Sequence, residues 1–170
     1  MAKPDLATIP EFYHTYVNRV EEQNVTEALQ NSLLKASELL QQIPEERWNF
    51  RYAEGKWSIK EMVQHIVDAE RIFAYRALCI ARGEGASLPG FDENSYAARS
   101  NADSRVKEEL IQEWEVVRRA TLLLFQSFDE EQLTRTGTAN NKSINVLAIG
   151  FISAGHVLHH LQILKERYLA

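Results

Sequence analysis

Apolar residues recur every three or four positions along most of the chain, which is the spacing of one buried face on an α-helix. No alternating strand pattern extends over more than three residues. Capping residues, glycines and prolines divide the pattern into segments. The pattern predicts long helices over about 24–43, 58–82, 103–128 and 144–168. A short extra helix is expected before them, from Thr8 to about Arg19.

The clearest helix start lies at Ser58. Ser58 is expected to be the N-cap and Glu61 its partner in a capping box, while Trp57 and Met62 are placed to form a hydrophobic staple. Thr8 and Glu11 suggest a similar box at the N-terminus, and Asn24 and Ser143 are expected to cap two of the long helices. The third long helix is expected to bury one stripe, made of Leu110, Trp114, Val117, Thr121, Leu124 and Phe128.

Four long helices with no strands predict an all-α fold, a four-helix bundle in a single domain over residues 1–170. Two of the expected connections, near 45–57 and 83–102, are long for a simple up-and-down bundle. At least one crossover between helices is therefore expected.

Composition and charge are those of an ordinary globular protein. The 170 residues are 45% hydrophobic and 25% charged, with a formal net charge of -5. No cluster of Lys and Arg stands out, so we expect no nucleic-acid partner. The pair Arg118-Arg119 is interpreted as a solvated helix edge, and the single cysteine, Cys79, forms no intrachain disulfide.

The most apolar run extends from Val146 to Ile152 and is too short to span a bilayer. The N-terminal residues lack the apolar region of a signal peptide, so we expect a soluble, cytoplasmic protein without a membrane partner. The same run is apolar nearly all round and contains Gly150, which permits close helix approach. It therefore suggests a homodimer interface, with burial inside one chain as the alternative.

Two histidines, His156 and His160, carry the candidate chemistry. Residues four apart lie on one face of a helix, so both imidazoles could bind one metal ion. We expect His65, in the middle of the second long helix, to be the third ligand. Three protein ligands leave an open coordination position, which is the arrangement of catalytic zinc sites. The alternative is that the histidines are hydrogen-bonded core or surface residues.

Several neighbours could support this site. Asp68 and His159 are candidates for orienting a ligand histidine. Arg76 lies on the His65 stripe and could either bind an anionic substrate or form half of a buried ion pair. Glu70 is interpreted as an exposed partner of a neighbouring arginine. Cys79 lies too far along the helix to share the metal and is expected in the core.

Two segments carry a family resemblance. The segment from Trp57 to Arg71, with Glu61 and His65, resembles the second-helix motif of the DinB/YfiT-like family. The segment from Ala154 to Tyr168 resembles the C-terminal signature of that family. The resemblance extends over nearly the whole chain.

The resemblance implies a bundle of up-down-down-up order, with His65, His156 and His160 at the positions of the family's metal triad. It also implies a homodimer and a divalent ion such as zinc or nickel. Better-understood relatives include bacillithiol S-transferases and a mycothiol-dependent isomerase, so a low-molecular-weight thiol cofactor is a further expectation.

These observations favour a divalent-metal enzyme in which a thiol or water attacks a small electrophilic substrate, as an S-transferase or a hydrolase. The alternative is a non-catalytic, dimeric metal-binding or stress-response bundle.

Overall fold

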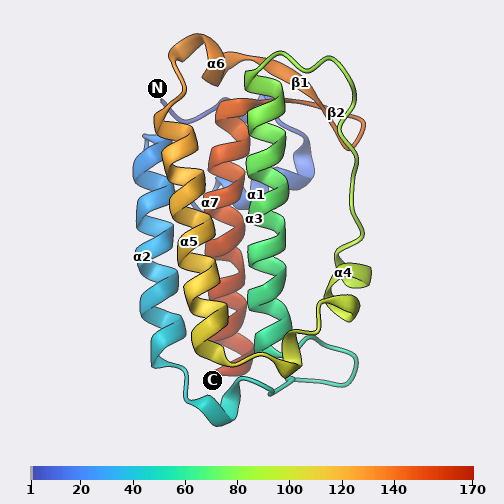
Figure 1. The fold of residues 1–170 in the computed structure, drawn as a ribbon. Coiled ribbons are helices and arrows are strands. Elements are labelled where there is room, and N and C mark those ends of the chain that lie inside the picture. Colours follow the sequence, from blue (N-terminus) through green and yellow to red (C-terminus); the bar gives the residue numbers. More distant parts are fainter. Residues whose placement is uncertain (1) are drawn as a thin grey trace.

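The computed structural model describes residues 2–170 and confirms the predicted all-α bundle (Figure 1). Its helices and strands are α1 (His14–Val17), α2 (Val25–Gln42), α3 (Ile59–Ala81), α4 (Glu93–Arg99), α5 (Lys107–Gln126), α6 (Glu130–Thr134), β1 (Thr136–Ala139), β2 (Lys142–Asn145) and α7 (Val146–Ile163). A π-helical turn, Leu164–Tyr168, continues α7, and short 3-10 turns occupy Leu6–Thr8, Glu11–Tyr13, Glu45–Arg47 and Ala102–Ser104.

The four long helices follow the predicted up-down-down-up order. In Figure 1, α2 and α7 run in one direction, and α3 and α5 run in the other. Helix α3 packs against α5 and α7, and α2 packs against the same two helices. This arrangement places α3 antiparallel to α7, so the first part of α3 faces the second half of α7.

Two of the predicted helix starts are confirmed. The hydroxyl of Ser58 accepts a hydrogen bond from the backbone N–H of Glu61, and the Glu61 carboxylate accepts one from the N–H of Ser58. Asn24 caps α2 through its side-chain oxygen, which accepts from Thr26 and Glu27. Both caps depend only on neighbours in the sequence, which is why the pattern alone identifies them.

The segment before α7 differs from the prediction. It forms the hairpin β1–β2, where no strand was expected, and Asn140 and Asn141 make the turn with φ angles of 50° and 59°. Two consecutive residues with positive φ are typical of a type I′ hairpin turn. Ser143 lies inside β2, opposite Thr138, so it does not cap α7. The cap is Asn145, whose side chain accepts from the N–H of Ala148.

The N-terminal capping box at Thr8 was predicted wrongly. Asp5 caps the first 3-10 turn, and the Thr8 hydroxyl donates to the carbonyl of Asp5. The extra helix is only α1, which packs against α7. A Cβ at Gly155 would lie 2.0 Å from the carbonyl oxygen of Tyr16. The glycine therefore allows the backbone of Tyr16 to rest directly on α7, beside His156.

The third long helix begins later than predicted. Asp103 belongs to a 3-10 turn before α5, where its carboxylate accepts from the hydroxyl of Ser58 at 2.6 Å and pairs with Arg51 at 2.6 Å. The connection that precedes it contains the unpredicted helix α4, which packs against α3. In Figure 1 this connection runs along the outer side of α3.

Two charged residues lie in the core rather than at the surface. Arg118 is 0% exposed and Glu70 is 1% exposed, and they form an ion pair at 3.0 Å. The hydroxyl of Ser153 also donates to Glu70, and Arg118 donates to the carbonyl of Ser153 and the hydroxyl of Ser32. The interpretations of Arg118 as a solvated edge and of Glu70 as an exposed residue are therefore wrong.

The buried face of α5 differs from the predicted stripe at two positions. Val117 and Leu124 are only half-buried, whereas Arg118 and Phe125 lie inside the bundle. Leu110, Trp114, Thr121 and Phe128 are buried as expected. The hydrophobic pattern selected Val117 instead of its neighbour Arg118, and Leu124 instead of its neighbour Phe125. An arginine is normally a surface residue, so the pattern did not include Arg118 in the buried stripe.

Helix α7 is the central helix, and every residue from Val146 to Val157 is buried in the bundle. Gly150 faces Val25 and Phe125 of the same chain. Burial within one chain therefore accounts for the apolar run, and the predicted homodimer now depends on the family resemblance alone.

The apolar run from Val146 to Ile152, which alone is too short to span a bilayer, belongs to a longer apolar helix. By length and composition alone, the helix Val146–Tyr168 would be sufficient. However, 78% of its most apolar window is buried inside the bundle, as is common for core helices.

The buried ion pair gives a testable prediction. Replacing Arg118 with Ala should lower the free energy of unfolding by about 3–5 kcal/mol, because it leaves the Glu70 carboxylate buried without its partner. The matched control is Arg119→Ala. Arg119 is largely exposed and pairs with Glu115 at 3.7 Å, so its loss should cost less than about 1 kcal/mol. Urea denaturation measures both values, and equal losses would contradict the role assigned to Arg118.

Candidate metal centre

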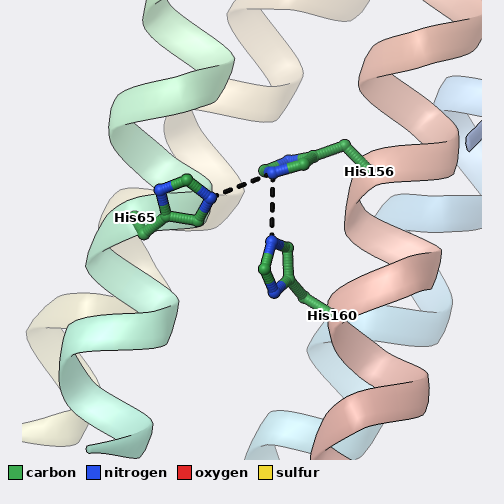
Figure 2. Close-up of side chains that lie close together, drawn as sticks. All are labelled: His65, His156 and His160. Carbon is green, nitrogen blue, oxygen red and sulfur yellow. Dashed lines mark hydrogen bonds between the residues drawn. The ribbon is translucent and has the colours of Figure 1, made fainter. Parts of the chain in front are cut away.

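Three histidines from two helices meet in the core. His65 comes from the first third of α3, and His156 and His160 come from the second half of α7 (Figure 2). The Nε2 atom of His156 lies 3.0 Å from Nε2 of His65 and 3.1 Å from Nε2 of His160. All three side chains are buried, and one nitrogen from each lies within 4.8 Å of the others. The structure thus brings together the three residues that the sequence singled out.

The antiparallel packing of α3 and α7 determines this meeting. The spacing of four residues places His156 and His160 on the face of α7 that looks at α3. The register between the two helices is fixed nearby, where Ser153 of α7 donates to Glu70 of α3. Ser153 precedes His156 by less than one helical turn, and Glu70 follows His65 by little more than one.

Hydrogen bonds among the histidines cannot satisfy this arrangement. An imidazole nitrogen has a single in-plane position, which holds either a proton or a lone pair. The Nε2 atom of His156 can therefore make one good hydrogen bond, yet it has two Nε2 neighbours at about the same distance. A divalent ion between the three rings would use all three lone pairs. In a tetrahedral site with bonds of roughly 2.0–2.1 Å, ligand nitrogens lie about 3.4 Å apart, close to the observed separations.

The cluster is also electrostatically suited to a cation. Burial lowers the pKa of His65 from its ordinary value of 6.5 to about 4. Burial and the neighbouring imidazoles hold the pKa values of His156 and His160 well below that ordinary value. All three rings are therefore neutral near pH 7, which is the form that binds metal.

Aromatic rings surround the histidines, and the sequence did not predict their role. The Trp57 ring lies 4.8 Å from that of His65, and the Tyr16 and Phe73 rings meet the edge of His156 at 5.4 and 5.7 Å. The sequence indicates Trp57 as a packing residue and part of a hydrophobic staple. Nothing local to Tyr16 or Phe73 indicates a site, because their position depends on how α1 and α3 pack against α7.

Two cavities open on the cluster. The first, of about 180 Å³, is lined by His65 and His156 together with Arg76, and we call it the arginine cavity. The second, of about 220 Å³, is lined by His160 with Trp57 and two tyrosines, Tyr52 and Tyr168, and we call it the tyrosine cavity. Glu93, at the start of α4, lines both cavities. The cluster can therefore be reached from two sides.

The other candidate residues lie outside the triad. Asp68 accepts a hydrogen bond from Gln64 at 3.0 Å and lies 3.9 Å from Arg71, so its contacts are with those residues and not with a histidine. His159 is half-buried, and its ring lies 5.3 Å from that of Tyr16. Cys79 is half-buried near the far end of α3, at the edge of the core.

Arg76 is the candidate that shares a cavity with the histidines. Its side chain is buried, and its Nη2 atom donates to the carbonyl of Pro89 at 2.6 Å. Within the described residues 2–170, no carboxylate lies within 4 Å of it. The structure therefore does not place Arg76 in a buried ion pair.

An up-down-down-up bundle whose core contains three converging histidines is typical of helical proteins with a metal-binding site between their helices. Comparison with known proteins gives the family. The model of the DinB superfamily matches residues 28–164, and the chain belongs to that superfamily.

Similar proteins share either the sequence or the fold. A protein of Oceanobacillus iheyensis that bears the name "putative metal-dependent hydrolase" is 26% identical over 77% of this chain and 76% of its own length. YfiT from Bacillus subtilis, described as a probable metal-dependent hydrolase with an unusual four-helix bundle topology, superposes with a TM-score of 0.75 and 14% identity, over 84% of this chain and 82% of its own. The mycothiol-dependent maleylpyruvate isomerase has a TM-score of 0.67 and 12% identity, over 81% of this chain but only 58% of its own. The last two likenesses show the fold alone.

The lowered histidine pKa values predict how the stability of the metal-free protein depends on pH. In the unfolded chain an imidazole takes up its proton near pH 6.5, whereas folded His65 does so near pH 4. The unfolded state therefore binds more protons between these values, so the stabilisation is complete above about pH 6.5 and is lost as the pH falls toward 4. For His65 alone the loss between pH 7 and pH 5 is about 2 kcal/mol.

Urea unfolding of metal-free protein at several pH values measures this loss. The parent and the variant His65→Gln are compared by how steeply their free energies of unfolding change with pH. A general destabilisation of the variant lowers its values at every pH and does not affect this comparison. His65→Gln should flatten the decline between pH 7 and pH 5 by about that amount. An unchanged slope would contradict the assignment of a buried, neutral imidazole at this position.

Proposed function

We propose that this chain is a divalent-metal-dependent enzyme in which His65, His156 and His160 hold the ion. The observation that carries the proposal is the convergence of three buried, neutral imidazole nitrogens that hydrogen bonding alone cannot satisfy. A cluster of neutral donors favours zinc or nickel, since imidazole suits both. Zinc or nickel is accordingly the ion that we propose.

The bound ion would act as a Lewis acid and lower the pKa of a nucleophile, either water or a low-molecular-weight thiol. The residues of the chain supply the surroundings. The rings of Trp57, Tyr16 and Phe73 pack directly against the imidazoles of His65 and His156. The two cavities admit a small electrophilic substrate to the cluster.

Water is the nucleophile that we favour. The Oceanobacillus iheyensis relative, which covers most of this chain, bears the name of a metal-dependent hydrolase. Glu93 lines both cavities, and its carboxylate could accept a proton from a nucleophile in either of them. This makes Glu93 our candidate general base.

A thiol is the second candidate, and one feature of the site favours it. One cavity is lined by His65 and His156, and the other by His160, so the site could hold two reactants, a thiol and an electrophile. Hydrolysis needs only one organic substrate. The mycothiol-dependent isomerase shares the fold. A thiol S-transferase is therefore the alternative to a hydrolase.

Metal binding comes first among the tests. We expect the parent protein to bind close to one equivalent of Zn²⁺ or Ni²⁺, and His156→Ala/His160→Ala to bind none, because one ligand cannot retain the ion. His159→Ala is the matched control, since His159 lies on the same helix but outside the cluster, and it should keep the metal. Elemental mass spectrometry after removal of free ion gives the stoichiometry. If the parent protein stays metal-free, the proposal of a metal-dependent enzyme is wrong and the alternative of a non-catalytic bundle is favoured.

The nature of the nucleophile can be tested with general substrates. Metal-loaded protein is assayed for hydrolysis of 4-nitrophenyl acetate without thiol, and for conjugation of cysteine to 1-chloro-2,4-dinitrobenzene. A hydrolase should show the first activity, at least about a hundredfold above the chelator-treated protein, because a metal supplies several kcal/mol of transition-state stabilisation. Metal-dependent conjugation without hydrolysis would select the transferase.

A further inference from the structure

Arg76 has a buried positive charge without an acidic partner. The residue is 4% exposed, and its Nε atom has no hydrogen-bond partner in residues 2–170. Its Nη2 atom donates to a neutral carbonyl, that of Pro89, and its other polar neighbour is the phenol of Tyr13, which is also uncharged. Buried arginines are normally paired with a carboxylate, because an isolated charge in the interior is costly. The buried pair Glu70–Arg118 shows how the same fold satisfies such a charge elsewhere.

The unpaired arginine belongs to the cavity that contains the histidines. Arg76 lines the arginine cavity together with His65 and His156. Along α3 it lies roughly 16–17 Å beyond His65 in helix rise, but side chains on a helix lean toward its N-terminus. The Cα–Cβ bond of Arg76 is therefore tilted toward the end of α3 that carries His65, and both residues line the same cavity. A small molecule could touch Arg76 at one end and approach the cluster with the other.

The remaining walls describe the body of that molecule. Three aromatic rings, Phe12, Phe73 and Phe91, line the same cavity and offer an apolar surface. The phenol of Tyr13 lies beside the guanidinium. Burial raises the pKa of Tyr13, with Arg76 opposing that effect, so the phenol keeps its proton and can donate a hydrogen bond. One cation and one neutral donor suit a carboxylate group.

A second anionic group would be unfavourable in this cavity. Glu93 is the carboxylate in its lining and would repel another negative charge near the mouth. Arg76 provides one full positive charge, which is balanced by one carboxylate. A compound with a single negative charge therefore fits better than a dianion.

We propose that the substrate is a small organic monocarboxylate with an apolar or aromatic body, whose carboxylate is bound by Arg76. The reacting end of the molecule then lies at the histidine cluster, and Arg76 orients it. This assignment rests on the proposed function for the role of the cluster, but carboxylate binding at Arg76 can be measured without any turnover.

The test uses 4-fluorobenzoate and its neutral isostere 4-fluorobenzamide as probes, with binding followed by fluorine NMR on the full chain after zinc addition. The parent should bind the benzoate at least about tenfold more tightly than the benzamide, because only the anion forms the charge-assisted contact. Arg76→Met should remove this preference. Arg76→Lys should retain the affinity within a few-fold, and Arg71→Met, an exposed arginine on the same helix, should leave it unchanged.

Three results would overturn the proposal: no binding of the benzoate to the parent, no preference over the benzamide, or equal benzoate affinity in the parent and in Arg76→Met. Benzoate could instead bind to the metal alone. The variant His156→Ala/His160→Ala, which is expected to lose the metal but keeps Arg76, separates the two cases. Benzoate binding should persist in that variant if Arg76 provides the site, and its loss would also overturn the proposal. Metal content measured on each sample separates this outcome from failure of the metal centre itself.

Discussion

The ion pair between Glu70 and Arg118 lies at the point where all four long helices meet. Glu70 belongs to α3 and Arg118 to α5, while Ser153 of α7 and Ser32 of α2 complete the hydrogen bonds around them. An apolar interface tolerates small sliding of one helix along another, whereas a buried charge tolerates very little, because any misalignment leaves it without a partner. We infer that this polar cluster sets the register of the bundle. Since each histidine lies within about two helical turns of Glu70 or Ser153 on the same helix, the same register brings their nitrogens together.

The electrostatics of the metal centre follow from that placement. Imidazoles inside an apolar bundle lose water and become weak bases, as the pKa of about 4 at His65 shows. The resulting neutral cluster suits a cation, and the two buried arginines near it differ in how their charge is balanced. Arg118 is neutralised by Glu70, whereas Arg76 is not neutralised by any residue within 4 Å in the described part of the chain. The fold therefore keeps one positive charge available on the wall of the cavity beside a group of metal-type ligands.

Local patterns in the sequence were sufficient for much of the fold and for the three histidines. The Ser58 capping box and the apolar periodicity depend on residues a few positions apart, and the spacing of His156 and His160 places them on one helical face. Features that depend on distant partners were missed. The burial of Arg118 depends on Glu70, which is distant in the sequence, so the local pattern predicts a surface residue. Tyr16 reaches the site only because Gly155, which has no side chain, leaves room for its backbone. The hairpin was missed although Asn140 and Asn141 carried a turn signal, because its strands are too short to show an alternating pattern.

Anomalous diffraction from crystals of the zinc-loaded protein, collected at the zinc absorption edge, tests the central claim most directly. We expect a single strong peak between α3 and α7, from an ion bonded to the Nε2 atoms of His65, His156 and His160 at roughly 2.0–2.1 Å. A map without density at that position, with the three imidazoles hydrogen-bonded to one another or to water, would contradict it.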